Sequence, residues 1–191
     1  LARRASVGEK TRDIAPDFAY YGMATCAGCG LCATACPVGI DTGELIRRLR
    51  GRQLGGLSHR LGTWTAEHFG LAATLARYGL ATGHAVSRVR GEERLIRLSD
   101  SAWKRDMPLA GRTPRQRPDV GDPVVYFPTC GARIFGPQTA DEAALPDVVM
   151  TVLQRAGYAP RLPDGFEGLC CGQMLDSKGL SAAADQMADA L

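Results

Sequence analysis

The sequence lacks the run of about eighteen apolar residues that a membrane-spanning helix needs, and it has no secretory signal. These absences predict a cytoplasmic protein, either free or peripheral at the inner face of the membrane. An initiating methionine is also missing: the sequence begins at Leu1 in a basic polar stretch and stops at Leu191 partway along a helical pattern. We therefore expect a fragment of a longer polypeptide.

Cysteine, in contrast, is concentrated in one place. Four of the 7 cysteines lie in the run CAGCGLCATACPVG, namely Cys26, Cys29, Cys32 and Cys36. Their C-x2-C-x2-C-x3-C-P spacing is that of bacterial ferredoxins, in which thiolates hold an iron–sulfur cluster. Small residues between the cysteines let the backbone close around an inorganic core, and Pro37 turns the chain away after the fourth cysteine. The run predicts a 4Fe-4S cluster as the cofactor.

Other interpretations of the run are less favoured. A zinc site usually has two C-x2-C pairs with a longer spacer. Cysteines this close together cannot pair as disulfides without strain, and buried structural thiols are not so densely spaced. A G-x-G-x-x-A match from Gly28 to Ala33 is spurious, since no strand precedes it. Cys36 either closes the same cluster or binds a second one, because the cysteine before the proline does so in two-cluster ferredoxins.

Charge is unevenly distributed, although the net charge is only +3. Residues 1–46 have net charge −1, residues 47–118 have +10, and residues 119–191 have −6. The basic middle block suggests nucleic-acid binding as an alternative function. The arginines are dispersed along predicted helices without interleaved aromatic residues, so a solvated or interdomain surface is the favoured interpretation.

Hydrophobic periodicity divides the chain into three expected segments and predicts a mixed α+β to α/β fold. Residues 1–50 form the cluster module, whose exit helix is capped by Asp41 or Thr42. Residues 51–121 form a basic helical connector, in which an apolar stripe from Leu57 to Val89 predicts a packing face. A further helix is expected over about 92–104, followed by a linker over 107–123. We expect His68 to be a core or boundary residue, and His59 and His84 to be surface residues.

The third segment, residues 122–191, is expected to be a small parallel β-α-β module. A buried strand is predicted at 124–127, a helix at 146–156, a second strand at 158–162, and a closing helix from about Leu180. Cys130 follows the first strand, and Cys170 and Cys171 follow the second. Because the carboxyl ends of parallel strands share one edge of a sheet, these thiols are expected to gather there, with Gly172 allowing a turn that exposes both adjacent cysteines.

Three motifs in this order resemble the C-terminal iron–sulfur half of FAD-linked D-2-hydroxyacid dehydrogenases, of the bacterial D-lactate dehydrogenase type. They are TCAGCGLCATACPVGIDTG, YFPTCGARIFGP and GFEGLCCGQMLDSKG, and the resemblance covers about residues 15–191. It implies a helical ferredoxin-like module, a long connector and half of a cysteine-rich CCG module. It also implies that Cys26, Cys29, Cys32 and Cys36 ligate a 4Fe-4S cluster, and that Cys130, Cys170 and Cys171 form the first half of a second metal site.

The resemblance further implies an oxidoreductase with an upstream FAD domain as its partner. There, flavin oxidises the substrate and the cluster passes electrons singly to a quinone, cytochrome or other carrier. The chain alone is not expected to turn over substrate, because the flavin domain and the second CCG half are not in this sequence. An alternative in the same class is the iron–sulfur subunit of glycolate oxidase or glycerol-3-phosphate dehydrogenase. These commonly have two ferredoxin runs, whereas this chain has one. An alternative of another class is a nucleic-acid-binding protein with a structural cluster.

Overall fold

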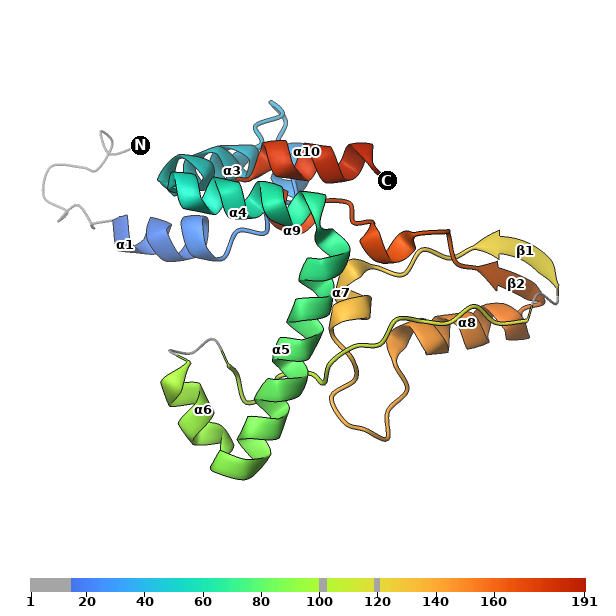
Figure 1. Ribbon diagram of the computed structural model, residues 1–191. Helices are drawn as coiled ribbons and strands as arrows, with labels where there is room; N and C mark the ends of the chain where they lie inside the picture. Colours follow the sequence, from blue (N-terminus) through green and yellow to red (C-terminus); the bar gives the residue numbers. More distant parts are fainter. Residues whose placement is uncertain (1–14, 100–102, 119–120) are drawn as a thin grey trace, which may run out of the picture. The chain divides into compact units, whose positions relative to one another are not determined.

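The computed structural model describes residues 15–99, 103–118 and 121–191. Its architecture is mixed α+β, mostly helical with a two-stranded parallel sheet (Figure 1). The chain forms two compact units. Of the described residues, the first unit combines 15–64 with 172–186, and the second combines 65–99, 103–118, 121–171 and 187–191. The residues after the paired cysteines therefore pack with the ferredoxin-type run.

The first unit is helical. Its elements are α1 (Ala15–Asp17), the π-helix η2 (Phe18–Ala24), α2 (Leu31–Ala35), α3 (Thr42–Gln53), most of α4 (Gly56–Glu67), α9 (Gln173–Asp176) and most of α10 (Ser181–Asp189). The predicted exit helix is confirmed as α3: the Asp41 side chain caps it by accepting a hydrogen bond of 3.0 Å from the backbone N–H of Glu44.

A close backbone approach joins α3 to the turn after α9. A Cβ added at Gly51 would lie 2.6 Å from the carbonyl oxygen of Gly179, which itself has φ +87°. Side chains cannot be accommodated at either position without moving the backbone. Ile46, Leu175, Ala183 and Ala184 are buried in this unit. The two glycines therefore let residues 172–186 pack directly against the helix that follows the cluster loop.

The second unit begins with the long helix α5 (Phe69–Arg90), which α6 (Glu92–Leu98) follows after Gly91. Its other elements are β1 (Asp122–Val125), α7 (Cys130–Ile134), α8 (Leu145–Arg155), β2 (Tyr158–Arg161) and the 3-10 helix η3 (Phe166–Gly168). The strands pair in parallel, with Asp122 opposite Tyr158, and α8 packs on β2 (Figure 1). The predicted parallel β-α-β arrangement is thus confirmed.

Two predictions about burial are wrong. The first strand covers 122–125 rather than 124–127, and it is not buried, since Val125 is 72 % exposed. A sheet of only two strands leaves much of its surface accessible to solvent. The apolar stripe from Leu57 to Val89 is also exposed, with Tyr78 at 67 % and Val89 at 84 %. In α5 the buried residues are instead Phe69, Ala73 and Leu80.

The helical stripe is interrupted where α4 ends and α5 begins. His68 separates them with non-helical dihedrals, and it is exposed rather than a core residue. His59 is exposed as predicted. His84, predicted at the surface, is half-buried: its Nε2 lies 3.0 Å from the Pro108 carbonyl oxygen, and its ring packs edge-on against Trp103. Apolar periodicity therefore located the helices but not the face that each one buries.

The helix predicted over 92–104 ends at Leu98 among the described residues, and residues 100–102 lie outside them. The expected linker, of which 119–120 also lie outside, packs within the second unit. Leu109 and Gly111 exchange backbone hydrogen bonds with the chain at 134–137, and the Thr113 hydroxyl accepts from Arg77. In the part of the chain that the structure describes, no helix has both the length and the apolar character needed to cross a membrane.

Candidate metal and thiol sites

The four cysteines of the ferredoxin-type run lie on one loop and the short helix that follows it. Cys26 and Cys29 lie between η2 and α2, Cys32 lies within α2, and Cys36 is the residue at which α2 ends. Gly28 and Gly30 adopt φ of +66° and +73°, a region that favours glycine. The loop therefore takes a backbone path at these two positions that other residues would adopt only with strain.

Hydrogen-bond donors lie close to three of the four sulfurs, and one of them is the Gly28 N–H, which donates to Cys26 Sγ at 3.4 Å. The Thr42 hydroxyl and then the Gly43 N–H lower the pKa of Cys32. For Cys36, the N–H groups of Ile40 and Val38 lower the pKa in the same way. The donors to Cys32 and Cys36 come from the segment that leads into α3. Donors that favour the thiolate form also favour ligation of a metal, because the thiolate is the ligand.

Two arginines of α3 hold the loop through its carbonyl groups. Arg50 donates to the Cys26 carbonyl at 2.8 Å and to the Met23 carbonyl at 2.9 Å, and also to that of Ser177. Arg47 donates to the Gly28 carbonyl and forms an ion pair with Asp176 at 3.4 Å. These arginines were not singled out from the sequence as supports of the loop. Their spacing of three residues, which places both on one helix face, was the available signal.

The donor set suits an iron–sulfur cluster. It consists of four soft sulfur atoms within eleven residues, with N–H donors and arginine side chains close by, and such clusters are anionic when bound by thiolates. Cys29 is exposed, whereas Cys26, Cys32 and Cys36 are half-buried. Among the described residues, no three His, Cys, Asp or Glu side chains are already grouped closely enough to hold a metal ion.

The second unit brings Cys130 and Cys170 together. Cys130 begins α7, after Thr129 caps that helix by accepting a 3.2 Å hydrogen bond from the Ala132 N–H. A hydrogen bond from the Cys170 thiol, followed by the Gly131 N–H and the charge of Arg133, lowers the pKa of Cys130 to about 6, against the opposing effect of burial. Cys170 is buried, at 3 % exposed. The two strands of the sheet thus lead to two cysteines that interact with each other.

Cys171 behaves differently from its neighbour. Gly172 has φ +76°, as the predicted turn requires, but only Cys171 is exposed there. The expectation that both adjacent cysteines would be exposed is wrong, because successive residues of an extended segment point to opposite sides.

Arg133 lies beside this sulfur pair and was not singled out from the sequence. It is the buried charged residue of the described core, at 4 % exposed. Its Cζ lies 5.6 Å from the ring centroids of Phe69, Phe127 and Phe166. The guanidinium donates to the carbonyls of Phe166 and Leu169. In the sequence, the only sign that Arg133 lies near Cys130 was its position three residues after that cysteine in a helical segment.

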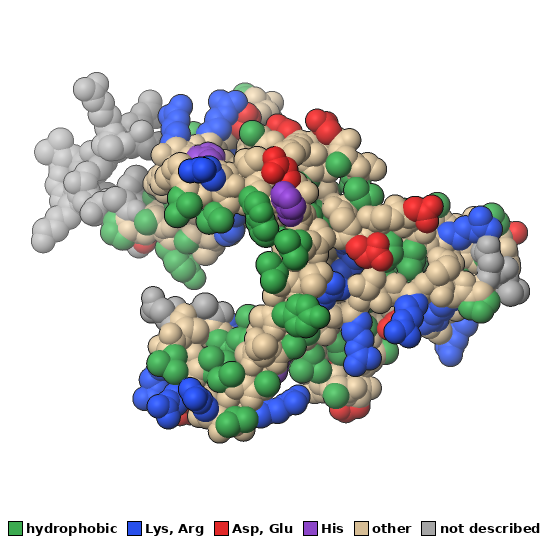
Figure 2. Space-filling view, in the orientation of Figure 1, with side chains coloured by type: hydrophobic (Ala, Val, Ile, Leu, Met, Phe, Trp, Pro, Cys, Tyr) green, Lys and Arg blue, Asp and Glu red, His purple; other side chains and the backbone are tan. Residues whose placement is uncertain are grey.

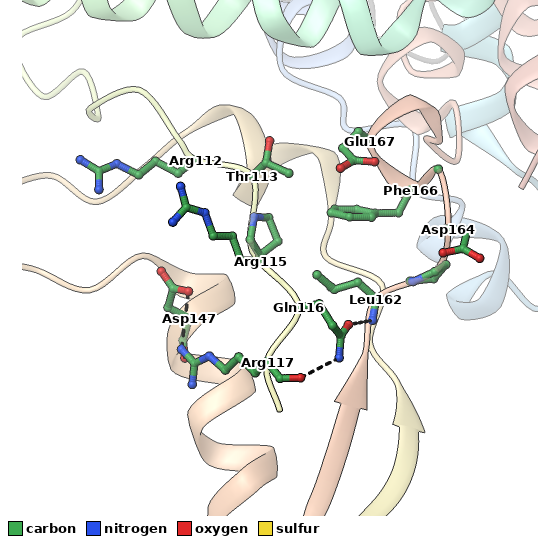
Figure 3. A pocket seen from close by; sticks show the side chains of 13 residues that line it. Arg112, Thr113, Arg115, Gln116, Arg117, Asp147, Leu162, Asp164, Phe166 and Glu167 are labelled. Atoms are coloured by element: carbon green, nitrogen blue, oxygen red, sulfur yellow. Dashed lines mark hydrogen bonds and ion pairs between the residues drawn. The ribbon is translucent and has the colours of Figure 1, made fainter. Parts of the chain in front are cut away.

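A cavity of about 1000 Å³ lies in the second unit at the carboxyl end of β2 (Figure 3). The Gln116 side chain closes one side by bonding the Pro160 carbonyl and the Leu162 N–H, each at 3.0 Å. Arg117 is paired with Asp147 at 3.6 Å. Three arginines and three carboxylates line the cavity, so its charge is balanced and indicates no particular ligand.

Many arginines of the basic middle block have structural partners. Arg47, Arg50, Arg77 and Arg117 all make hydrogen bonds within their own unit. Others, such as Arg90 and Arg94, are exposed near the turn between α5 and α6, where basic side chains gather in Figure 2. Some of the positively charged side chains of the block therefore make internal contacts, and others are exposed to solvent.

No protein-family model matches this chain, and neither the curated proteins nor the solved structures include a significant match.

Proposed function

We propose that this chain is the iron–sulfur electron-transfer region of a flavin-linked D-2-hydroxyacid dehydrogenase of the D-lactate type. The observation that carries the proposal is the C-x2-C-x2-C-x3-C-P run, whose Cys32 and Cys36 sulfurs face hydrogen-bond donors from residues 38–43. The helical first unit would be the ferredoxin-like module. The β-α-β part of the second unit, with Cys130, Cys170 and Cys171, would be half of a CCG module.

In this proposal, Cys26, Cys29, Cys32 and Cys36 hold a 4Fe-4S cluster, which when bound supplies a carrier of single electrons. The chain's own residues hold and shield that site. Arg50 fixes the carbonyl of Cys26, Arg47 fixes that of Gly28, and donors in the first turn of α3 favour the anionic form of the Cys32 sulfur. An FAD domain, joined to this chain or bound to it, would deliver the electrons, and a cytoplasmic or membrane-peripheral carrier would accept them.

Reconstitution under anaerobic conditions tests the cofactor. The protein should take up about four irons per chain and show visible absorbance that dithionite bleaches. The matched variants are Cys29→Ser and Cys171→Ser, which each remove one exposed cysteine. Only Cys29→Ser should lose iron. One tightly bound zinc without visible absorbance would refute the cluster, and equal iron in both variants would refute the assigned ligands.

The substrate class requires a separate test, because the cluster alone does not identify it. The complete coding sequence should include an FAD-binding domain, and the full-length protein should reduce an artificial electron acceptor with D-lactate or a related D-2-hydroxyacid. Activity with glycolate or glycerol 3-phosphate instead would favour the alternative subunits.

A further inference from the structure

The second cysteine motif, GFEGLCCGQMLDSKG, continues beyond its cysteines into the unit that contains the first motif. Its last seven residues, 173–179, form α9 and the turn after it, and they belong to the first unit together with the ferredoxin-type run. Gly51 of α3 and Gly179 of this turn approach so closely that neither position has room for a Cβ. The end of the second motif therefore packs against the helix that supports the cysteine loop.

Asp176 is the side chain of this stretch that reaches the supports of the loop. Its Oδ2 lies 3.4 Å from Nε of Arg47, and its Oδ1 accepts a hydrogen bond of 3.1 Å from the hydroxyl of Ser181, the first residue of α10. The side chains of the ion pair are 21 % and 30 % exposed, so solvent screens their attraction less than that of a surface pair. The carboxylate is thus held by α10 on one oxygen and holds Arg47 with the other.

Arg47 carries this contact on to the cysteine loop. Its guanidinium donates to the carbonyl of Gly28, and its aliphatic stem lies so close that a Cβ at Gly28 would be 3.3 Å from its Cγ. Gly28 is buried, and its N–H donates to Cys26 Sγ at 3.4 Å. The other carboxylate beside Arg47, that of Asp41, is farther away at 3.9 Å. Asp176 is therefore the nearer counter-charge that keeps the guanidinium in place on the loop.

We propose that Asp176 is a positioning residue for the cysteine loop, acting through Arg47 on the backbone of Gly28 and so on the sulfur of Cys26. The inference rests on the proposed function in that the loop is taken to bind a cluster. Residues that orient metal ligands from outside commonly affect how firmly the metal is held. The two cysteine motifs are then not independent modules, because a residue of the second motif determines how well the first retains its metal.

The first test uses the full chain without metal and follows the amide resonances of Gly28 and Cys29 by NMR, since the Gly28 carbonyl and the Cys29 N–H share one peptide group. Asp176→Asn keeps an acceptor for Ser181 but loses the charge, and should shift both resonances. Asp176→Glu should restore them toward their wild-type positions. Asp185→Asn is the control, because Asp185 is an exposed carboxylate of α10, and it should leave both unchanged. Unchanged resonances in folded Asp176→Asn protein would overturn the proposal.

The second test measures the rate at which a chelator removes iron from the reconstituted full chain. Asp176→Asn should lose iron about tenfold faster than the wild type. Arg47→Met should also lose it faster, and the double variant should be no faster than Arg47→Met alone, because Asp176 acts through Arg47. Additive effects would overturn the proposal, since they would show that Asp176 acts through Ser181 and α10 instead. A wild-type chain that takes up no iron would refute the proposed cluster, whereas the amide resonances of the metal-free protein decide the positioning role in either case.

Discussion

The Arg50 guanidinium donates a 2.8 Å hydrogen bond to the carbonyl oxygen of Cys26, which lies 24 residues earlier in the chain. The same side chain reaches the carbonyls of Met23 and Ser177. One residue of α3 thus joins the start of the cysteine loop to the segment after α9. Loops that bind metals depend on such supporting contacts to keep their ligands in place.

We therefore expect Arg50→Met to destabilise the protein by about 2 kcal/mol, because hydrogen bonds to a charged group are lost and three partly buried carbonyls are left without this donor. Urea unfolding of the cluster-free protein measures this. Arg48→Met is the control, since Arg48 is exposed and pairs only with Glu44 among the described residues. Similar stability in both variants would contradict the role assigned to Arg50.

Substituting the four cysteines of the run one at a time should show which of them hold the cluster. Cys26→Ser, Cys29→Ser and Cys32→Ser should each lose bound iron and destabilise the reconstituted first unit, because cluster binding and folding are coupled. Iron analysis and visible spectra measure the outcome. If Cys36→Ser keeps its iron and its spectrum, then Cys36 serves another site or none.

Cys130 should alkylate as a thiolate at unusually low pH. Because its pKa is lowered to about 6, the rate of reaction with iodoacetamide should rise through that pH and level off above it. In Cys170→Ala the donating thiol is removed, so the midpoint should move upward. Site-specific mass spectrometry reads the rate at Cys130 alone. A wild-type midpoint near the ordinary thiol value of 9.0 would contradict this prediction.

Ionisation of Cys130 should also influence the free energy of unfolding. Since the folded pKa lies below the unfolded value, ionised Cys130 stabilises the folded protein fully above the unfolded pKa, and this contribution decreases as the pH falls toward about 6. The difference in unfolding free energy between wild type and Cys130→Ser should therefore shrink between about pH 9 and pH 6. A difference that is constant over this range would show that the ionisation is not linked to folding.

Two glycines of α5 provide a matched pair of substitutions. A Cβ at Gly83 would lie 2.2 Å from the Trp103 ring, whereas at Gly79 no atom lies within 4 Å. Gly79→Ala should raise the free energy of unfolding by up to about 1 kcal/mol through helix propensity. Gly83→Ala should lower it, because the indole or the helix must move. Thermal or urea unfolding of both variants measures the difference, and equal shifts would show that Trp103 does not pack against Gly83.

Local signals in the sequence predicted several elements well. Asp41 was one of two caps predicted for the start of α3, and the places of Cys130 and Cys170 after their strands predicted that they gather at one sheet edge. Each of these depends on chemistry within a few residues or on a topological rule.

The contacts that the sequence did not predict all depend on distant parts of the chain. Arg133 could be recognised only once Phe69 and Phe166 were known to surround it, and Arg50 only once its three carbonyl partners were placed. The apolar stripe on α5, which was expected to be a packing face but is exposed, shows a related limit of prediction from sequence. Periodicity identifies an amphipathic helix but does not say which of its faces the rest of the chain covers.

Asp41 connects the cysteine loop to α3 in a way that depends on a proton. Its carboxylate caps the helix at Glu44 and also accepts from the Cys32 thiol at 3.5 Å, while Arg47 lies 3.9 Å away. A metal-bound Cys32 would have no proton to donate, and the carboxylate would then keep the Glu44 N–H and Arg47 as its partners. The amide resonance of Glu44 would then act as a built-in reporter, distinguishing loaded from empty protein by NMR without any observation of the metal itself.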